Sequence, residues 1–373
     1  MVAIIIFIII LGVLIFVHEL GHFLTAKRNG VKSDEFGFGF PPRMAGFFQD
    51  EKTKKYKFIW GNKEIDTNNT IYSINWIPLG GFVKIKGADT TETGDDSFAS
   101  KKAWPRVKIL AAGVVMNFIL AWILLSLSLM IGAPEMISSG DKNVSKAKIQ
   151  IDSVTPGSPA EMAGIKIGDE IIKENIQTDF MVVEDVQKFI KDNKGNEIEL
   201  SLKRGDEIVN IKVVPRENAP EGEGVLGISM AQTNIVSYPF YKAIWMGAVE
   251  VYQITIAILM ALGGIIISLF SGKGVGADVS GPIGIAILTK QVATLGMTYV
   301  LRFAALLSIN LAIINALPIP ALDGGRILFI LIEKIKGSPV SQEMEQKFHT
   351  IGFVLLILLM ILVTLRDVVK IIK

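Results

Sequence analysis

The chain has no cysteine among its 373 residues, and this absence removes two kinds of structure. Disulfide bonds cannot form, and a tightly bound metal ion has no thiolate ligand, so such an ion would depend on histidine and on carboxylate oxygen. Histidine is scarce as well, because the chain contains only three. A metal site of the histidine type would therefore use most of the histidines in the protein.

An excess of charge of either sign is also missing. The 38 basic and 36 acidic residues nearly cancel, so the charge gives no reason to expect a nucleic-acid partner. Charged residues make up only 20% of the chain and hydrophobic residues 50%, a balance that lies well outside that of soluble globular domains. We therefore expect a protein whose main partner is the lipid bilayer.

Four long apolar runs predict membrane-spanning helices. The first run, 1–26, is long enough to cross a hydrocarbon core of about 30 Å at about 1.5 Å per residue. A cleaved signal peptide is the alternative, but the run lacks a basic start and a small-residue cleavage site, and it leads directly into Lys27-Arg28. The other expected spans are 107–133, 301–325 and 348–366.

Two polar stretches separate these spans. The first, 27–106, contains the run 71–87, whose two strand-like halves flank Pro78-Leu79-Gly80-Gly81 and predict a β-hairpin that touches or enters the membrane. The second, 134–230, combines alternating strand patterns with one amphipathic helix, which indicates a small α+β domain. Within it, Gly157 to Ile172 resembles the helix and strand of a PDZ domain.

The first expected helix ends in a motif that fits zinc chemistry. His18 and His22 stand four residues apart, so both imidazoles lie on one helical face and can share a zinc ion, with Glu19 beside them as a general base. A chance match, or polar residues that face a neighbouring helix, is the alternative. We favour the metal site, because polar groups are costly in a bilayer and two of the three histidines fall in this turn. The third, His349, is expected to be only an interfacial residue.

A third protein ligand would complete such a site and leave the fourth position to water. The candidate is Asp323, which follows Pro318 and Pro320 at the end of an uncharged helix. The two prolines lack N–H groups and force the helix to unwind, which is tolerated at membrane depth only where protein or water satisfies the freed carbonyls. Asp323 could simply begin the following loop, but a histidine pair that lacks a third ligand favours a role in the metal site.

Taken together, the motifs resemble those of the site-2 protease family, in its bacterial RseP/RasP-type branch. They are the HExxH motif at His18, a GxxxN segment from Gly113 to Asn117, the PDZ-like insert, and NxxPxPxLDG from Asn315 to Gly324. The resemblance covers essentially the whole chain. It implies a zinc-dependent endopeptidase that cleaves transmembrane segments of single-pass membrane proteins. Such substrates include anti-sigma factors already shortened by a preceding site-1-type protease, and signal-peptide remnants.

The resemblance also implies roles for individual residues. The metal ligands fall on His18, His22 and Asp323, and the catalytic base falls on Glu19, which would take a proton from water while zinc polarises the scissile carbonyl. The residues expected to bind substrate lie in the broken helix and in the hairpin: Asn315, Pro318, Pro320, Gly80, Gly81, Phe82 and Val83. Gly113 and Asn117 would support the site.

Two points of this assignment are less direct. Asn117 could equally hold helices together, because polar side chains often bridge helices in a membrane. The chain also has a single PDZ-like domain, whereas some relatives have two in tandem. The way in which those relatives restrict the access of substrates therefore does not transfer in detail to this chain.

We therefore expect an α-helical membrane protein with about four transmembrane helices, a membrane-associated β-hairpin and an inserted α+β PDZ-like domain. It would be a multi-pass protein of the bacterial cytoplasmic (inner) membrane. The PDZ-like domain would be extracytoplasmic, and the active site would lie within the membrane toward the cytoplasmic side. The expected boundaries are 27–106 for the cytoplasmic loop, 134–230 for the PDZ-like domain and 231–300 for a membrane-associated or re-entrant helical segment.

A fifth apolar run, Ala243 to Ser271, has the length of a spanning helix but is not expected to cross. The metal site requires His18, His22 and Asp323 at one depth. If the fifth run crossed, the next helix would run in the opposite direction and Asp323 would emerge roughly a membrane thickness from the histidines. The run should instead lie along the outer interface or re-enter, with Glu250 and Gln253 toward water or protein.

Two other classes of function stay open at this point. A non-catalytic membrane scaffold could display the PDZ-like domain to bind C-termini, although the intact HExxH motif and Asp323 argue against it. A membrane-anchored zinc protease could have its active site in water. That class normally places HExxH on a soluble or interfacial helix rather than at the end of a largely apolar run.

Overall fold

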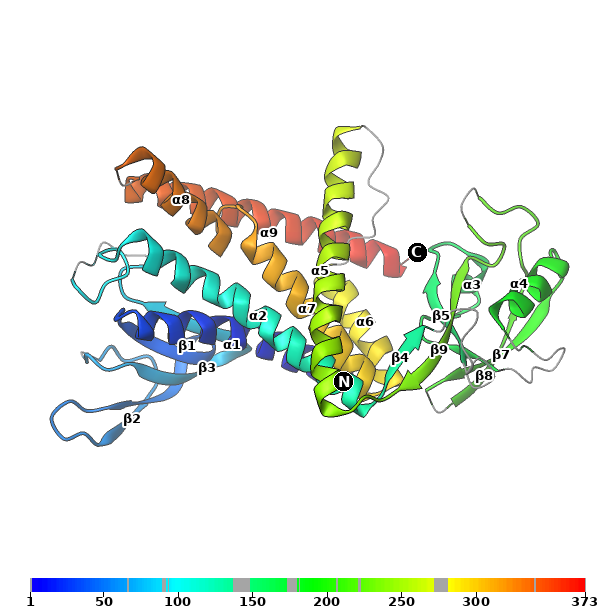
Figure 1. Ribbon diagram of the computed structural model, residues 1–373, viewed down its shortest axis with the longest axis horizontal. Helices are drawn as coiled ribbons and strands as arrows, with labels where there is room; N and C mark the ends of the chain where they lie inside the picture. Colours follow the sequence, from blue (N-terminus) through cyan, green and yellow to red (C-terminus); the bar gives the residue numbers. More distant parts are fainter. Residues whose placement is uncertain are drawn as a thin grey trace. The chain divides into compact units, whose positions relative to one another are not determined.

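The computed structural model describes residues 2–65, 67–88, 92, 94–136, 148–172, 180, 182–205, 207–220, 223–271, 281–338 and 340–372. The chain forms two compact units, whose elements are labelled in Figure 1. The first unit comprises Met1–Leu125, Ile244–Ile287 and Phe303–Lys373, and the second comprises Ser126–Ala243 and Leu288–Arg302. Both units are therefore assembled from segments that lie far apart in the sequence.

Long apolar helices dominate the first unit. They are α1 (Val2–Arg28), α2 (Ala103–Ile131), α5 (Phe240–Phe270), α7 (Met297–Ala316) and α9 (Gln342–Ile372), with the shorter α8 (Asp323–Lys336) between α7 and α9. The shorter α6 (Pro282–Leu295) begins in the first unit and continues into the second. Among the described residues, these five long helices have the length and apolar composition needed to cross a membrane, one more than the four expected. The additional helix is α5, and length and composition do not decide whether it crosses.

The third expected span, 301–325, is divided in the structure. Helix α7 ends at Ala316, and Asp323 is the first residue of α8 rather than the last of a spanning helix. The reason is the pair Pro318 and Pro320, which cannot donate the backbone hydrogen bonds that a continuing helix needs. The described residues of the remaining expected spans lie within α1, α2 and α9, except that Gly132 and Ala133 lie beyond the end of α2.

Helices α2, α5 and α7 pack around one apolar cluster. Ala121 and Leu125 of α2 meet Ala305, Ile309 and Ile313 of α7. Side chains of α5 cover the same cluster: Val251, Ile254, Ile258 and Leu262. In Figure 1, α5 stands across α2 and α7 rather than along them. The fifth apolar run therefore belongs to a helix that is unbroken over 31 residues and packs against α2 and α7.

A three-stranded sheet lies beside α1. Its strands β1 (Ser33–Gln49), β2 (Tyr56–Trp60) and β3 (Ile71–Ile85) have the order β2-β1-β3. Phe36 of β1 pairs with Val83 on one side and with Tyr72 on the other, so the first half of β1 lies between the two halves of β3. The expected hairpin at 71–87 is therefore wrong: its two halves share a sheet, but another strand separates them.

Buried charge and aromatic packing fix this sheet. The Arg43 guanidinium donates to the Glu35 carboxylate through two bonds of 2.8 and 2.6 Å, which joins the two halves of β1. On the helix side, the ring of Phe36 stacks on that of Phe23, with centroids 4.6 Å apart. Gly80 has a φ of +84°, and a Cβ there would lie 2.6 Å from Ile15. Only glycine lets the strand approach α1 so closely.

The second unit contains a six-stranded antiparallel sheet of order β4-β9-β5-β6-β7-β8. The strands are β4 (Ala133–Met136), β5 (Lys148–Val154), β6 (Glu170–Ile171), β7 (Ile198–Arg204), β8 (Glu207–Val213) and β9 (Ile228–Val236). Two short helices, α3 (Pro159–Met162) and α4 (Val183–Asp192), accompany it. The expected domain limits, 134 and 230, fall inside β4 and β9, because residues beyond 230 continue to pair in the sheet.

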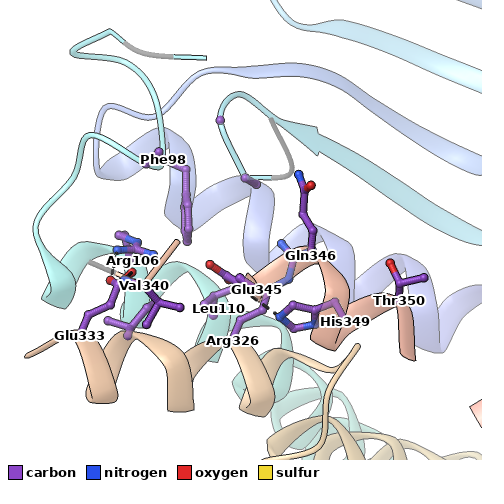
Figure 2. Close-up of a pocket in the computed structure, with 14 residues that line it drawn as sticks. Phe98, Arg106, Leu110, Arg326, Glu333, Val340, Glu345, Gln346, His349 and Thr350 are labelled. Atoms are coloured by element: carbon purple, nitrogen blue, oxygen red, sulfur yellow. Dashed lines mark hydrogen bonds and ion pairs between the residues drawn. The ribbon is translucent and has the colours of Figure 1, made fainter. Parts of the chain in front are cut away.

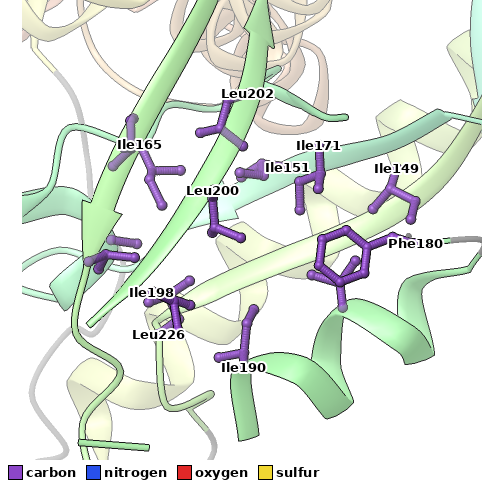
Figure 3. Packing of buried hydrophobic residues seen from close by; sticks show 14 residues of the cluster. Ile149, Ile151, Ile165, Ile171, Phe180, Ile190, Ile198, Leu200, Leu202 and Leu226 are labelled. Atoms are coloured by element: carbon purple, nitrogen blue, oxygen red, sulfur yellow. The ribbon is translucent and has the colours of Figure 1, made fainter. Parts of the chain in front are cut away.

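The core of the second unit follows the period of its strands. Ile198, Leu200 and Leu202 alternate along β7 and are fully buried, as are Ile149 and Ile151 on β5. Figure 3 shows these side chains gathered on one face of the sheet, with Phe180, which precedes α4, and Ile190 of α4 against them. The alternating patterns in the sequence therefore predicted these strands correctly.

We predict that α5 does not cross the bilayer. Single cysteines at Ser271, just after α5, and at Lys370, near the end of α9, should both react with a membrane-impermeant maleimide applied to intact cells. The chain has no native cysteine, so the labelling has no background from the protein itself. A cysteine at Lys54, in the turn before β2, is the control and should react only after lysis. If the cysteine at position 271 reacts only after lysis, one of two statements is wrong: that α5 does not cross, or that His18 and Asp323 lie at the same depth in the membrane.

Candidate metal centre

Three possible ligand atoms converge beside α1. His18 and His22 are 7% and 6% exposed, and their Nε2 atoms lie 3.1 Å apart. The Asp323 Oδ2 atom lies 3.0 Å from the first of these nitrogens and 3.3 Å from the second. A tetrahedral ion with ligand bonds of about 2.0–2.1 Å separates its ligand atoms by roughly 3.3 Å. The three side chains therefore form a group that fits a zinc ion and leaves one position open.

A tight reversal of the chain brings Asp323 back to α1. After α7 ends, the Ile319 N–H donates to the carbonyl of Leu317 over 2.7 Å, and α8 begins four residues later. A Cβ on Gly324 would lie 2.2 Å from the Leu317 oxygen, and one on Gly325 would lie 2.3 Å from the Ile319 oxygen. Since no side chain fits at either position, the two glycines allow the first turn of α8 to fold against the chain that precedes it.

The second nitrogen of each histidine has a partner on α2. His22 Nδ1 lies 2.8 Å from the carbonyl oxygen of Ile109, so its N–H donates there and Nε2 is left for a metal. His18 Nδ1 lies 3.2 Å from the side-chain amide of Asn117, which is completely buried. The atom at this distance is the amide nitrogen Nδ2. Exchange of the amide nitrogen and oxygen, which are nearly equal in size, would let Asn117 accept the Nδ1–H of His18 and leave Nε2 for a metal. The hydroxyl of Ser308 donates to the backbone carbonyl of Asn117 over 2.8 Å, so this residue also joins α2 to α7.

Glu19 lies in the same cavity as the three candidate ligands. The cavity has a volume of about 380 Å³ and is lined by parts of α1, α2, β3, α7 and α8. The backbone of Val83 hydrogen-bonds to the Glu19 carboxylate, and both histidines and Asp323 are close enough to interact with it electrostatically. A carboxylate with this position can exchange a proton with a water molecule in the cavity.

The residues expected to bind substrate are divided by the structure. Val83 lines the cavity from β3, and Asn315 lines it from α7. Gly80 and Gly81 instead allow β3 to pack on α1, where Cβ atoms would meet Ile15 and Phe16. Phe82, Pro318 and Pro320 are not among the described residues that line the cavity. Pro320 contacts α9 instead, through Gly352.

Sequence reasoning did not assign a role in the site to two residues that lie near it. Arg326 follows Asp323 by three positions on α8 and lines both this cavity and a neighbouring one. Its helical spacing from Asp323 was a usable signal, because residues three apart share a face. His349 was expected to be an ordinary interfacial residue, but it hydrogen-bonds the backbone of Ala321 beside the site. No local pattern could have indicated that contact.

Comparison with protein families identifies the chain. The family model of peptidase family M50 matches residues 6–62 and 57–359. The chain belongs to peptidase family M50. The family resemblance predicted from the motifs is thereby confirmed, and the protein is a metalloprotease of the site-2 protease family.

Individual relatives of this M50 peptidase cover almost its whole length. The chain is 34% identical over 369 residues to a Clostridium acetobutylicum protein, with 98% of this chain and 97% of that protein aligned. The name of that protein describes it provisionally as a zinc metalloprotease. The chain is 30% identical over 447 residues to the regulator of sigma-W protease RasP of Bacillus subtilis, with 97% of each aligned. The zinc metalloprotease RasP of Geobacillus kaustophilus is 31% identical over 450 residues, with 99% of this chain and 98% of that protein aligned.

These comparisons determine the cofactor and the general setting. The expected cofactor, Zn²⁺, is confirmed, and the long apolar helices together with the relatives make the chain a multi-pass membrane protein. Two imidazole nitrogens and one carboxylate oxygen are donors that zinc accepts in catalytic sites.

We predict that Gly113→Ala in this M50 peptidase strongly reduces zinc binding. A Cβ at this position would lie 2.5 Å from His22 Nε2 and 2.6 Å from His18 Cε1, so one or both imidazoles must move. Elemental analysis of the purified protein should show most of the zinc lost. Gly263→Ala is a matched control on α5, because nothing lies within 4 Å of the added Cβ, and it should keep full zinc content. Wild-type zinc affinity in the Gly113 variant would contradict the proposed ligand geometry.

Proposed function

We propose that this chain is an intramembrane endopeptidase that cuts the transmembrane segments of single-pass membrane proteins. His18, His22 and Asp323 hold Zn²⁺, and Glu19 acts as the general base. The observation that supports this proposal most directly is the convergence of these four side chains in one cavity between long apolar helices. A water-soluble zinc protease would not place its ligands on a helix as apolar as α1.

In the proposed reaction, each residue around the metal site has a separate role. Zinc, when bound, acts as a Lewis acid that polarises a carbonyl and makes a water molecule more acidic. Glu19 accepts a proton from the attacking water and returns it to the leaving amine. Asn117 and the carbonyl of Ile109 orient the two imidazoles through their Nδ1 atoms, which keeps each Nε2 directed into the cavity.

A helical substrate presents a physical obstacle to this reaction. Its carbonyls are engaged in hydrogen bonds to N–H groups four residues further along, and opening a helix in lipid leaves unpaired polar groups that are costly. A partner must replace those bonds. The second half of β3 is suited to this, because it lies at the edge of its sheet and the Val83 N–H is directed at Glu19 in the cavity.

We infer that an extended substrate adds to the edge of β3 near Val83 as a further strand. Asn315 lines the cavity from α7 and can bond the substrate backbone from the other side. The prolines 318 and 320 have a different role in this proposal. They end α7 and allow the reversal that returns Asp323 to the histidines, so they act on the site without contacting the cut bond.

The proposed substrates are anti-sigma factors already shortened by a site-1-type protease, or signal-peptide remnants. Support comes from the name of the Bacillus subtilis relative, regulator of sigma-W protease RasP, because it names a protease together with a sigma factor. The proposed location is the bacterial cytoplasmic membrane, with the active site toward the cytoplasmic side. The sheet of the second unit, which we interpret as PDZ-like, would then be extracytoplasmic and would filter access to the site.

We predict that Glu19→Gln abolishes proteolysis while zinc stays bound, because the change removes the base but none of the three ligands. Turnover of a single-pass substrate by the purified protein should fall by about 10²–10⁴-fold. Mass spectrometry of the products, with and without a chelator, measures both the rate and the cut sites. Glu250→Gln on α5 is the same change away from the site and should cleave normally. Wild-type turnover in the Glu19 variant would exclude this mechanism.

A separate prediction tests strand addition at β3. Val83→Pro removes the N–H that faces the cavity, whereas Val83→Ala shortens the side chain but keeps the N–H. Relative to the alanine variant, the proline variant should slow cleavage of intact helical substrates more than cleavage of substrates with Gly or Pro near the cut site. The reason is that a weakened helix needs less help to open. Equal losses on both kinds of substrate would remove β3 from the mechanism.

A further inference from the structure

The turn that carries Asp323 contains an unusual backbone conformation. Ala321, two residues before Asp323, has a φ of +74°. This left-handed region is disfavoured for any residue with a Cβ, and glycine is the residue that normally occupies it. Since Pro320 fixes the preceding φ and α8 begins at Asp323, the conformation of Ala321 decides the direction in which the ligand leaves the turn.

A side chain from a distant helix holds this turn. The backbone N–H of Ala321 donates to Nδ1 of His349, on α9, over 2.8 Å. Because Nδ1 accepts this bond, the ring proton resides on Nε2, which faces a carboxylate oxygen of Glu345 at 3.8 Å. Figure 2 shows His349 beside Glu345 and Arg326. These residues line a cavity of about 370 Å³, which shares Phe98, Leu110 and Arg326 with the cavity of the metal site. The ring of Phe329, on α8, lies 5.8 Å from the His349 ring and limits its movement.

A second contact brings α9 against the same turn. A Cβ on Gly352, three residues after His349 and on the same helical face, would lie 2.4 Å from Pro320 Cβ and 2.7 Å from the Pro320 oxygen. Only glycine allows the helix to approach so closely. The close packing places the His349 ring within hydrogen-bond distance of Ala321.

We infer that His349 is a positioning residue of the metal centre. It supplies the acceptor for the Ala321 N–H, holds the left-handed turn, and thereby fixes Asp323 beside His18 and His22. The inference rests on the proposed function, in which Asp323 is a zinc ligand. Without the acceptor, a partly buried N–H loses its partner and the turn relaxes toward a conformation that suits alanine. Asp323 would then no longer meet the two histidine nitrogens at their present distances.

The test compares two polar replacements of similar size in the purified full-length protein. The side-chain oxygen of asparagine can stand near the position of Nδ1, whereas the terminal amide of glutamine reaches the position of Nε2. Zinc affinity is measured by competition with a chromogenic chelator. His349→Asn should stay within about threefold of wild type, and His349→Gln should bind zinc about 10–100-fold more weakly, the usual effect of removing an outer hydrogen bond from a metal site.

Control variants separate this inference from a general loss of folding. Thr350→Val changes the next residue of α9, which lines the same cavity, and should keep wild-type affinity. Ala321→Gly makes the left-handed turn accessible without help, so the loss caused by His349→Gln should shrink to a few-fold in that background. An equal loss in both backgrounds, or equal affinities of the asparagine and glutamine variants, would overturn the inference.

A further variant distinguishes failure of the inference from failure of the proposed function. Asp323→Asn should weaken zinc binding at least as strongly as His349→Gln. If Asp323→Asn binds zinc as tightly as wild type, the ligand assignment itself is wrong, and with it the role of His349. If Asp323→Asn loses zinc while every His349 variant retains it, only the positioning role is excluded.

Discussion

The structure of the first unit depends on one constraint: Asp323 must meet two histidines that precede it by about 300 positions. Its Oδ2 atom lies 3.0 Å from His18 Nε2, and only 17% of the Asp323 side chain and 9% of the His18 side chain are exposed. Charged and polar groups are costly in such surroundings unless they are paired or bind a metal. The helix that approaches Asp323 must therefore end at the right place, and the chain must then reverse toward α1. Pro318 and Pro320 end it, and two glycines permit the reversal.

Glycine at helix contacts sets the distances around the site. Gly113 leaves space for both imidazoles, and Gly21 lets α1 approach α2 so closely that a Cβ there would lie 2.4 Å from the Ala112 oxygen. Gly80 and Gly352 do the same for β3 against α1 and for α9 against Pro320. In lipid, apolar side chains gain little from packing on one another, so close backbone approach and interhelical hydrogen bonds hold helices together. The contacts of Asn117 with His18 and Ser308 supply such bonds.

The sheet beside α1 holds an edge strand in a fixed position beside the cavity. The first half of β1 lies between the two halves of β3, and the Arg43–Glu35 pair joins the halves of β1. Strand β3 is therefore braced by β1 and by α1, while the Val83 backbone faces the cavity, where it hydrogen-bonds to Glu19. A simple two-stranded hairpin would be only marginally stable. The interleaved arrangement gives the same edge with a rigid support.

The sequence by itself determined the features that depend on neighbouring residues. The spacing of His18, Glu19 and His22 fixed them on one helical face, the apolar runs predicted α1, α2 and α9, and the alternating patterns predicted β5, β7 and β8. The motifs taken together also predicted the family correctly. Only the tertiary structure decided which groups meet across the chain: the placement of Asp323 by a tight reversal, the β1 strand between the halves of β3, and the bond from Ala321 to His349. Such contacts join segments that no local period relates, and they arise from close packing of whole elements, so a single sequence carries no direct signal of them.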